Sequence, residues 1–120
     1  MSWMRYGSLL MMLGVALGAF GAHGLKDTLT PEGKQVYQTA VLYHLIHGLA
    51  LFAIGWLSIL KPTETLVRAA GWAFLLGILL FSGSLYALAV TGIRKLGMIT
   101  PFGGLSFLIG WLCLFLAAKR

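Results

Sequence analysis

Four long runs of uncharged, mostly apolar residues constrain the fold of this chain more than any other feature. The runs extend over Tyr6–Leu25, Gln35–Leu60, Ala69–Ile93 and Leu96–Ala118. Each run reaches the roughly 20 residues that a helix needs to cross the hydrocarbon core of a bilayer. Because lipid offers no partner for a free backbone group, segments of this length are expected to be helical. The sequence therefore predicts an all-α integral membrane protein with spans at about residues 6–25, 35–60, 69–93 and 98–118.

The composition agrees with this class and argues against a soluble one. Hydrophobic residues make up 59% of the 120 residues, charged residues make up 10%, and the mean hydropathy is +0.90. So few charges cannot cover the surface of a small soluble domain. The net charge of +6 does not indicate a nucleic-acid partner, because Lys and Arg stand at the ends of the apolar runs. We expect a single four-span domain over residues 1–120, surrounded by the lipid bilayer.

Residues that start or stop helices lie between the runs. Thr30-Pro31-Glu32 is typical of a helix start, and Lys61-Pro62 is typical of a helix end. Gly92 is a candidate C-terminal cap, and Thr100-Pro101 predicts an N-cap that follows a non-helical entry over residues 96–99. Connections as short as these predict an antiparallel four-helix transmembrane bundle in which consecutive helices are neighbours.

The distribution of basic residues predicts the orientation. An even number of spans puts both termini on one side of the membrane. Basic residues are slightly more frequent on the terminal side, with Arg5, Lys61, Arg68, Lys119 and Arg120 there, against Lys26, Lys34, Arg94 and Lys95 on the other side. Cytoplasmic loops carry an excess of Lys and Arg, so we expect cytoplasmic termini.

Small residues align on one face of each expected helix. In membranes such stripes let helix backbones approach closely, because lipid provides no hydrophobic force between helices. The residues expected to pack helices in this way are Gly14, Gly18, Gly21, Gly48, Gly77, Gly103, Ser106 and Gly110. The first span carries further small residues, Ala16 and Ala19, on its opposite face. We therefore expect it to contact helices on both sides, within the bundle or across an oligomer interface, and we predict a homo-oligomer.

Polar residues within the runs gather in the half of the bundle away from the termini. They are His23, Tyr43, His44, His47, Ser84, Tyr86, Thr91 and Thr100. Polar groups inside a membrane are costly and often functional. We expect these side chains to line a polar pocket that opens toward the loops between the first and second spans and between the third and fourth.

Three interpretations of the histidines remain open. Each imidazole either fixes helix register through hydrogen bonds, or binds a small polar ligand, a lipid headgroup or a proton, or helps to hold a metal or haem. The candidate metal ligands are His23, His44 and His47, although no carboxylate lies within the runs to orient them. We expect no enzymatic activity, because no catalytic motif is present, and we predict no cofactor.

Four blocks of the sequence, in order along the chain, resemble the signature of the YgdD/YwdK family of small bacterial inner-membrane proteins. The blocks are Gly18–Leu25, Thr39–His47, Phe81–Tyr86 and Ile99–Gly104. The resemblance implies a multi-pass protein of the bacterial inner (plasma) membrane, and the family is one of unknown function. We therefore expect a non-enzymatic membrane component with a polar pocket. The alternatives are a transporter or proton-conducting subunit that uses the pocket and a metal- or haem-binding redox accessory protein.

Overall fold

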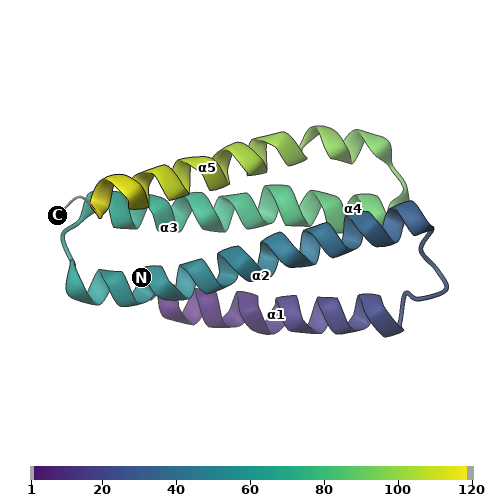
Figure 1. Ribbon diagram of the computed structural model, residues 1–120, viewed down its shortest axis with the longest axis horizontal. Coiled ribbons are helices and arrows are strands. Elements are labelled where there is room, and N and C mark those ends of the chain that lie inside the picture. Colours follow the sequence, from purple (N-terminus) through teal and green to yellow (C-terminus); the bar gives the residue numbers. More distant parts are fainter. Residues whose placement is uncertain (1, 119–120) are drawn as a thin grey trace.

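The computed structural model describes residues 2–118, which form four helical rods (Figure 1). The rods are α1 (Trp3–His23), α2 (Pro31–Leu60), a third rod and α5 (Thr100–Ala117). The third rod consists of α3 (Thr65–Gly77), the π-helical turn η1 (Ile78–Ser82) and α4 (Gly83–Thr91), and the 3₁₀ helix η2 (Arg94–Met98) leads into α5. Lys119 and Arg120, which contribute to the charge bias, lie outside the described residues.

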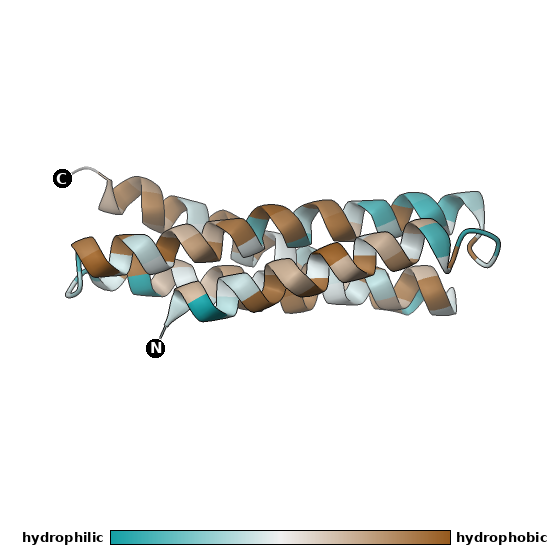
Figure 2. Ribbon diagram, turned by 90° about the horizontal axis from the view of Figure 1, so that it is seen from below, coloured by the Kyte–Doolittle hydropathy of each residue, from teal (hydrophilic) through white to brown (hydrophobic). Residues whose placement is uncertain are grey.

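The rods pack in the order in which they follow one another along the chain. α1 packs on α2, α2 packs on α3 and α4, and α5 packs on α3 and η1 (Figure 1). The helices at Trp3–His23, Pro31–Leu60, Thr65–Thr91 and Arg94–Ala117 are each long and apolar enough to cross a membrane. Hydrophobic residues cover most of their length (Figure 2). The predicted four-helix transmembrane fold is confirmed.

Three of the four predicted helix boundaries have the expected chemistry. The hydroxyl of Thr30 caps α2 by accepting the backbone N–H of Gly33 at 3.0 Å. α2 ends at Leu60, directly before Lys61-Pro62. Gly92 terminates α4 in the left-handed conformation, with φ of 72°, which a residue without a Cβ adopts at little cost.

The boundary before α5 differs from the prediction. Residues 94–98 form the 3₁₀ helix η2, so the entry to α5 is not free of helix, and Thr100 is not an N-cap. Its hydroxyl lies 2.6 Å from the hydroxyl of Ser84 on α4. A hydrogen bond between two membrane helices has taken the place of the local cap.

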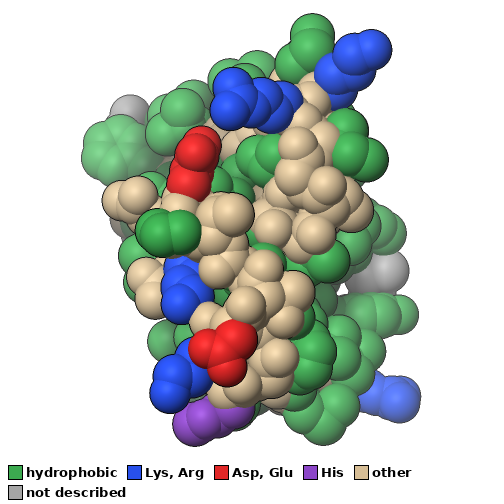
Figure 3. All heavy atoms as spheres, turned by 90° about the vertical axis from the view of Figure 1, so that its right-hand side faces the viewer, with side chains coloured by type: hydrophobic (Ala, Val, Ile, Leu, Met, Phe, Trp, Pro, Cys, Tyr) green, Lys and Arg blue, Asp and Glu red, His purple; other side chains and the backbone are tan. Residues whose placement is uncertain are grey.

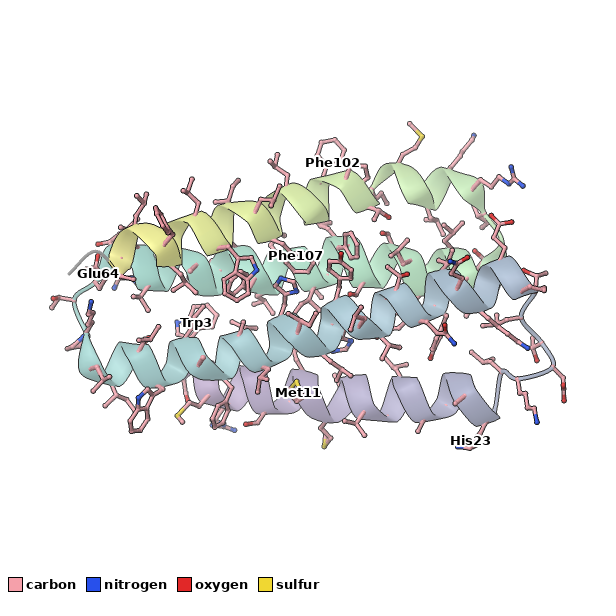
Figure 4. The ribbon with its side chains drawn as sticks, viewed as in Figure 1. Trp3, Met11, His23, Glu64, Phe102 and Phe107 are labelled. Atoms are coloured by element: carbon pink, nitrogen blue, oxygen red, sulfur yellow. The ribbon has the colours of Figure 1, made fainter. Side chains whose placement is uncertain are left out.

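The largest cluster of buried apolar side chains joins α1, α2, α3 and α5. Trp3 is 3% exposed and lies between α2 and the third rod (Figure 4), with its ring against Gly71 and Trp72. Leu51, Ile54 and Phe74 are fully buried beside it. Phe107 points inward from α5, whereas Phe102 on the same helix points outward (Figure 4). The bundle thus has a dense apolar centre rather than a polar channel in this region.

The small residues expected to pack helices all lie at contacts between helices. A Cβ added at any of the seven glycines would meet an atom of a neighbouring helix within 3.2 Å, and the eighth residue, Ser106, hydrogen-bonds the carbonyl of Ala73. The helices met are α2 from Gly14, Gly18 and Gly21, α1 from Gly48, α5 from Gly77, η1 from Gly103 and α3 from Gly110. These contacts leave no room for a larger side chain without rearrangement.

The opposite face of α1 has no helix against it in this chain. Met12 and Phe20 are 62% and 55% exposed, and Ala16 and Ala19 are exposed between them. Trp3, near the beginning of α1, contacts the third rod at Gly71 and Trp72. Within the described chain α2 covers only one face of α1, so of the two expected alternatives for the other face, the interface of a homo-oligomer stays a prediction.

Candidate functional site

His44 links three helices through its two ring nitrogens. Its Nε2 lies 2.7 Å from the backbone carbonyl oxygen of Leu10 on α1, and its Nδ1 lies 2.8 Å from the hydroxyl of Tyr86 on α4. A carbonyl oxygen can only accept, so Nε2 carries the hydrogen, and in a neutral imidazole Nδ1 then accepts the O–H of Tyr86. His44 is 3% exposed, and its two hydrogen bonds join α1, α2 and α4. An unpaired buried charge is costly inside a membrane, which favours the neutral imidazole.

His47 forms a second, separate arrangement one turn further along α2. Its Nδ1 donates to the carbonyl of Tyr43 in the preceding turn at 2.8 Å, and its Nε2 accepts the indole N–H of Trp111 at 3.0 Å. The ring stacks on Phe107 of α5 with a centroid separation of 3.6 Å and an interplanar angle of 7°. His47 therefore joins α2 to α5, whereas His44 faces α1 and α4.

The two histidines have opposite tautomers and no unused lone pair. An imidazole binds a metal through the nitrogen that carries no hydrogen. In His44 that nitrogen accepts from Tyr86, and in His47 it accepts from Trp111. Among residues 2–118, no group of three His, Cys, Asp or Glu side chains is placed to hold a metal ion. A metal or haem would have to break one of these hydrogen bonds before either ring became a ligand.

Glycine makes the backbone carbonyls of membrane helices available to these side chains. Leu10, which accepts from His44, precedes Gly14 by four residues, and Leu17, which accepts from the hydroxyl of Tyr37, precedes Gly21 by four residues. In a helix, a side chain leans over the turn that precedes it, where it covers the carbonyl four residues earlier. A glycine leaves that carbonyl open to a donor from the neighbouring helix.

A hydrogen bond to a carbonyl that a glycine leaves uncovered also joins α3 and α5. Ser106 donates to the carbonyl of Ala73 at 2.7 Å, and Gly77 stands four residues after Ala73. The phenol of Tyr37, the imidazole of His44 and the hydroxyl of Ser106 thus each bond a carbonyl that a glycine uncovers. Three of the chain's interhelical polar contacts depend on a residue that has no side chain.

The π-helical turn η1 places further hydroxyl groups at helix contacts. Ser82, at the end of this turn, is fully buried and donates to the carbonyl of Ala40 on α2 at 2.8 Å. Ser84 follows and pairs with Thr100 of α5. One extra residue per turn in a π-helix changes which side chains face each neighbouring helix. Ser82 consequently faces α2 and Ser84 faces α5.

The eight polar residues expected to line one pocket do not come together. His44 pairs with Tyr86, His47 with Trp111, and Ser84 with Thr100, so these groups form three separate contacts. Thr91 is exposed and bonds within its own helix end, to Ala87 and Ile93. Tyr43 is 37% exposed and lines a shallow hollow on the side of the bundle with His47 and Trp111.

His23 also lies apart from the other two histidines, so the expected three-histidine set is wrong. It occupies the last turn of α1, is exposed, and points away from α2 (Figure 4). The physical reason is helix periodicity: Gly14 and Gly21 turn one face of α1 toward α2, and His23 is on the other face.

Two partners of the histidines were missed by the sequence analysis. Trp111 lies in the last uncharged run and was not connected with His47. The partner of His44 on α1 is the main-chain carbonyl of Leu10. Every residue has such a carbonyl, so the residue type does not indicate this contact. The sequence nevertheless contains a pattern that indicates where these two helices meet: Tyr37 and His44 are seven residues apart, and so are Gly14 and Gly21. Matching intervals on adjacent helices indicate two contacts in register.

The fold and the polar contacts define a class: a small four-span integral membrane protein whose helices are linked by side-chain hydrogen bonds. Residues 17–104 match a family model described as "Protein of unknown function (DUF423)". The chain belongs to this family.

Curated relatives extend the similarity to nearly the whole chain. It is 49% identical to a UPF0382 membrane protein of Staphylococcus epidermidis and 50% identical to one of Staphylococcus haemolyticus, in each case over 95% of this chain and 92% of the relative. It is 46% identical to the UPF0382 membrane protein YwdK of Bacillus subtilis, over 95% and 93% of the two chains. The resemblance seen in the four sequence blocks is confirmed. No solved structure matches the chain.

Proposed function

We propose that this protein is a non-enzymatic component of the bacterial plasma membrane whose buried polar side chains hold its helices in register. One observation carries the proposal. Among residues 2–118, every buried side-chain nitrogen and oxygen has a hydrogen-bond partner within the chain. Polar groups that bind a substrate or move protons need a free donor or acceptor, or a neighbour that exchanges one, along a wet path. Here both ring nitrogens of His44 and of His47 already have a hydrogen-bond partner within the bundle.

The same contacts disfavour the two alternative functions. A transporter or proton-conducting subunit needs a polar path through both halves of the membrane. In this chain the polar contacts give way to a buried apolar cluster that includes Leu51, Ile54 and Phe74. A redox accessory protein would need a free imidazole lone pair, and both candidates accept hydrogen bonds instead.

The proposal is tested by reconstitution of the purified protein in liposomes. We expect a sample without a Soret band or stoichiometric metal in elemental analysis, and vesicles whose proton permeability equals that of protein-free vesicles. His44→Ala should lower the protein's resistance to unfolding and leave the proton permeability unchanged. Proton flux above the protein-free level that His44→Ala abolishes would replace this proposal with a proton pathway.

The proposed orientation places both termini in the cytoplasm. Its support is the charge bias, to which Arg5, Lys61 and Arg68 of the described chain contribute at the terminal end. A reporter pair fused after Arg120 tests it: a fluorescent protein that folds in the cytoplasm should be active, and alkaline phosphatase should be inactive. The reverse pair of activities would invert the topology.

The proposed assembly is a homo-oligomer in which the outer face of α1 contacts another copy. Its support is that the uncovered face combines the small residues Ala16 and Ala19 with the large residues Met12 and Phe20. Cysteine substituted at Ala16, in a chain where Cys113 is replaced by Ser, should form a crosslinked dimer in native membranes. Cysteine substituted at Leu108, an exposed position on α5, is the matched control. Monomer alone from both variants would count against the oligomer.

A further inference from the structure

A groove between α1 and α2 opens at the distal end of the bundle, the end opposite the chain termini. The groove has a volume of about 480 Å³. Lys26, Lys34 and Gln38 line it close to the connection between the two helices, and Ala22, Leu42 and Leu45 line it further along. From residue 34 to residue 45, a rise of 1.5 Å per residue gives the groove a length of about 16 Å. It runs from a charged mouth into the apolar part of the bundle surface.

Small residues of α1 create the hollow. Gly18, Gly21 and Ala22 present no long side chain on this part of the helix, so the surface of α2 is left uncovered beside them. Tyr37 lies at the groove, but its hydroxyl donates to the carbonyl of Leu17 at 2.5 Å. The deeper wall of the groove therefore offers a ligand mainly apolar contacts, and its polar groups without a partner in the described chain lie at its mouth.

The two lysines at the mouth have no anionic partner in the described part of the chain. Neither Lys26 nor Lys34 forms an ion pair there, and both are exposed. The acidic residues of the same end, Asp27 and Glu32, do not line the groove. Figure 3 views this end and shows blue basic side chains spread over it, with the red acidic side chains lying among them. The mouth of the groove thus carries two positive charges that an anion can approach.

We infer that this groove binds an anionic phospholipid, with the phosphate against Lys26 and Lys34 and one acyl chain along Ala22, Leu42 and Leu45. The chemistry of the groove matches the order of groups in a lipid: charge at the membrane surface and hydrocarbon below it. Basic pockets between membrane helices are recognised sites for acidic headgroups. The apolar extension favours a lipid over a free phosphate ion, since an ion would use only the mouth. This site is independent of the histidine contacts that support the proposed function.

Native mass spectrometry of the protein in detergent tests the inference, with phosphatidylglycerol and phosphatidylcholine as probes. Each lysine near a membrane surface contributes enough attraction that two should favour the anionic lipid by roughly tenfold or more. The double variant Lys26→Gln/Lys34→Gln should bind the two lipids about equally. The double variant Arg94→Gln/Lys95→Gln removes the same charge from the same end, outside the groove, and should keep the preference.

A second pair of variants tests the apolar part without a change of charge. Ala22→Phe places a ring in the groove and should weaken retention of phosphatidylglycerol severalfold, whereas Ala53→Phe, at an exposed position of α2 outside the groove, should not. All four variants alter exposed side chains, and their elution as the same folded species in size-exclusion chromatography is measured first.

Three results would overturn the inference. The first is equal retention of the two lipids by the unmodified protein. The second is an equal loss of preference in both charge variants, which would assign the effect to the overall charge of this end. The third is displacement of phosphatidylglycerol by inorganic phosphate at equal concentration, with Ala22→Phe having no effect, which would indicate a site for a free anion.

Discussion

At the scale of single residues, the polar atoms of this protein serve contacts between helices. His44 and His47 are both buried in α2, but their environments differ: one imidazole lies between a carbonyl and a phenol, the other between a carbonyl and an indole. A hydrogen bond between membrane helices contributes about 1 kcal/mol, with wide variation between sites. Each of these histidines makes two hydrogen bonds, so its replacement affects more than one contact.

Tyr86→Phe removes the donor to Nδ1 of His44 and leaves the ring in place. We expect the free energy of unfolding to fall by about 1 kcal/mol, because a buried acceptor loses its partner while the packing is kept. Equilibrium unfolding in mixed micelles measures this change. Tyr43→Phe is the control, since the Tyr43 hydroxyl makes no hydrogen bond within the described chain and its ring is partly exposed. Equal effects of the two substitutions would contradict the assigned contact.

Trp111→Phe tests the second histidine in the same way. The substitution removes the indole N–H that His47 accepts, and the stack of His47 on Phe107 remains. A loss of about 1 kcal/mol in unfolding free energy is expected. Trp56→Phe, at a position that is 56% exposed, should have little effect. If Trp111→Phe were also neutral, the contact would not contribute to stability in the membrane.

Residue type and helix periodicity predicted where the polar side chains lie along the chain, but not which of them meet. The periodicity that turns Gly14 and Gly21 toward α2 turns His23 away, and pooling all three histidines by depth ignored this rotation. The hydrogen bond between His47 and Trp111 puts the two side chains at about the same depth, so a search limited to the half rich in polar residues did not include Trp111.

At the scale of elements, close approach of helices is set by glycines that face a backbone or an aromatic ring. Gly103 and Gly104 are adjacent on α5 and differ sharply in this respect. A Cβ on Gly103 would overlap the backbone of Phe81, with the Cα of Phe81 only 2.7 Å away, whereas a Cβ on Gly104 would first meet the edge of the Phe81 ring at 3.7 Å. Alanine substitutions at these two adjacent positions therefore separate the effect of close helix packing from the effect of the substitution itself.

Gly103→Ala should destabilise the protein by roughly 1–3 kcal/mol, because α5 has to move away from η1 to make room. Gly104→Ala should be neutral or slightly stabilising, because alanine favours the helical conformation more than glycine does. Unfolding of both variants in the same micelles measures the difference. A Gly103→Ala variant as stable as Gly104→Ala would show that the approach of α5 to η1 is looser than the structure has it.

The elements themselves were largely predictable from charge and from turn residues. Uncharged runs predicted the four spans, and Thr30, Pro62 and Gly92 marked their ends. The π-helical turn at Ile78–Ser82 was not predictable, since its hydrogen-bond pattern depends on contacts with α2 and α5. The contact of Thr100 was not predictable either. Its hydroxyl could cap α5 or bond Ser84, and in the structure it bonds Ser84 on the neighbouring helix.

At the scale of the whole molecule, the bundle is elongated and α1 is its least enclosed helix. The molecule measures 49 × 26 × 20 Å, and α1 is held mainly by α2. The contacts of Tyr37 and His44 with the carbonyls of Leu17 and Leu10 fix its register. The lipid groove lies beside this same pair of helices, so a bound lipid and the outer face of α1 are near one another in the membrane.

We expect the two buried histidines to be neutral, with both ring nitrogens of each hydrogen-bonded to partners within the described chain. Nitrogen-15 NMR of histidine-labelled protein in lipid bilayers at pH 7 tests it most directly, with His44→Asn and His47→Asn variants to assign the signals. The account predicts a hydrogen on Nε2 of His44 and on Nδ1 of His47, each as a single tautomer, and a separate signal from exposed His23. A charged imidazolium at either buried position, or a mixture of tautomers, would contradict it.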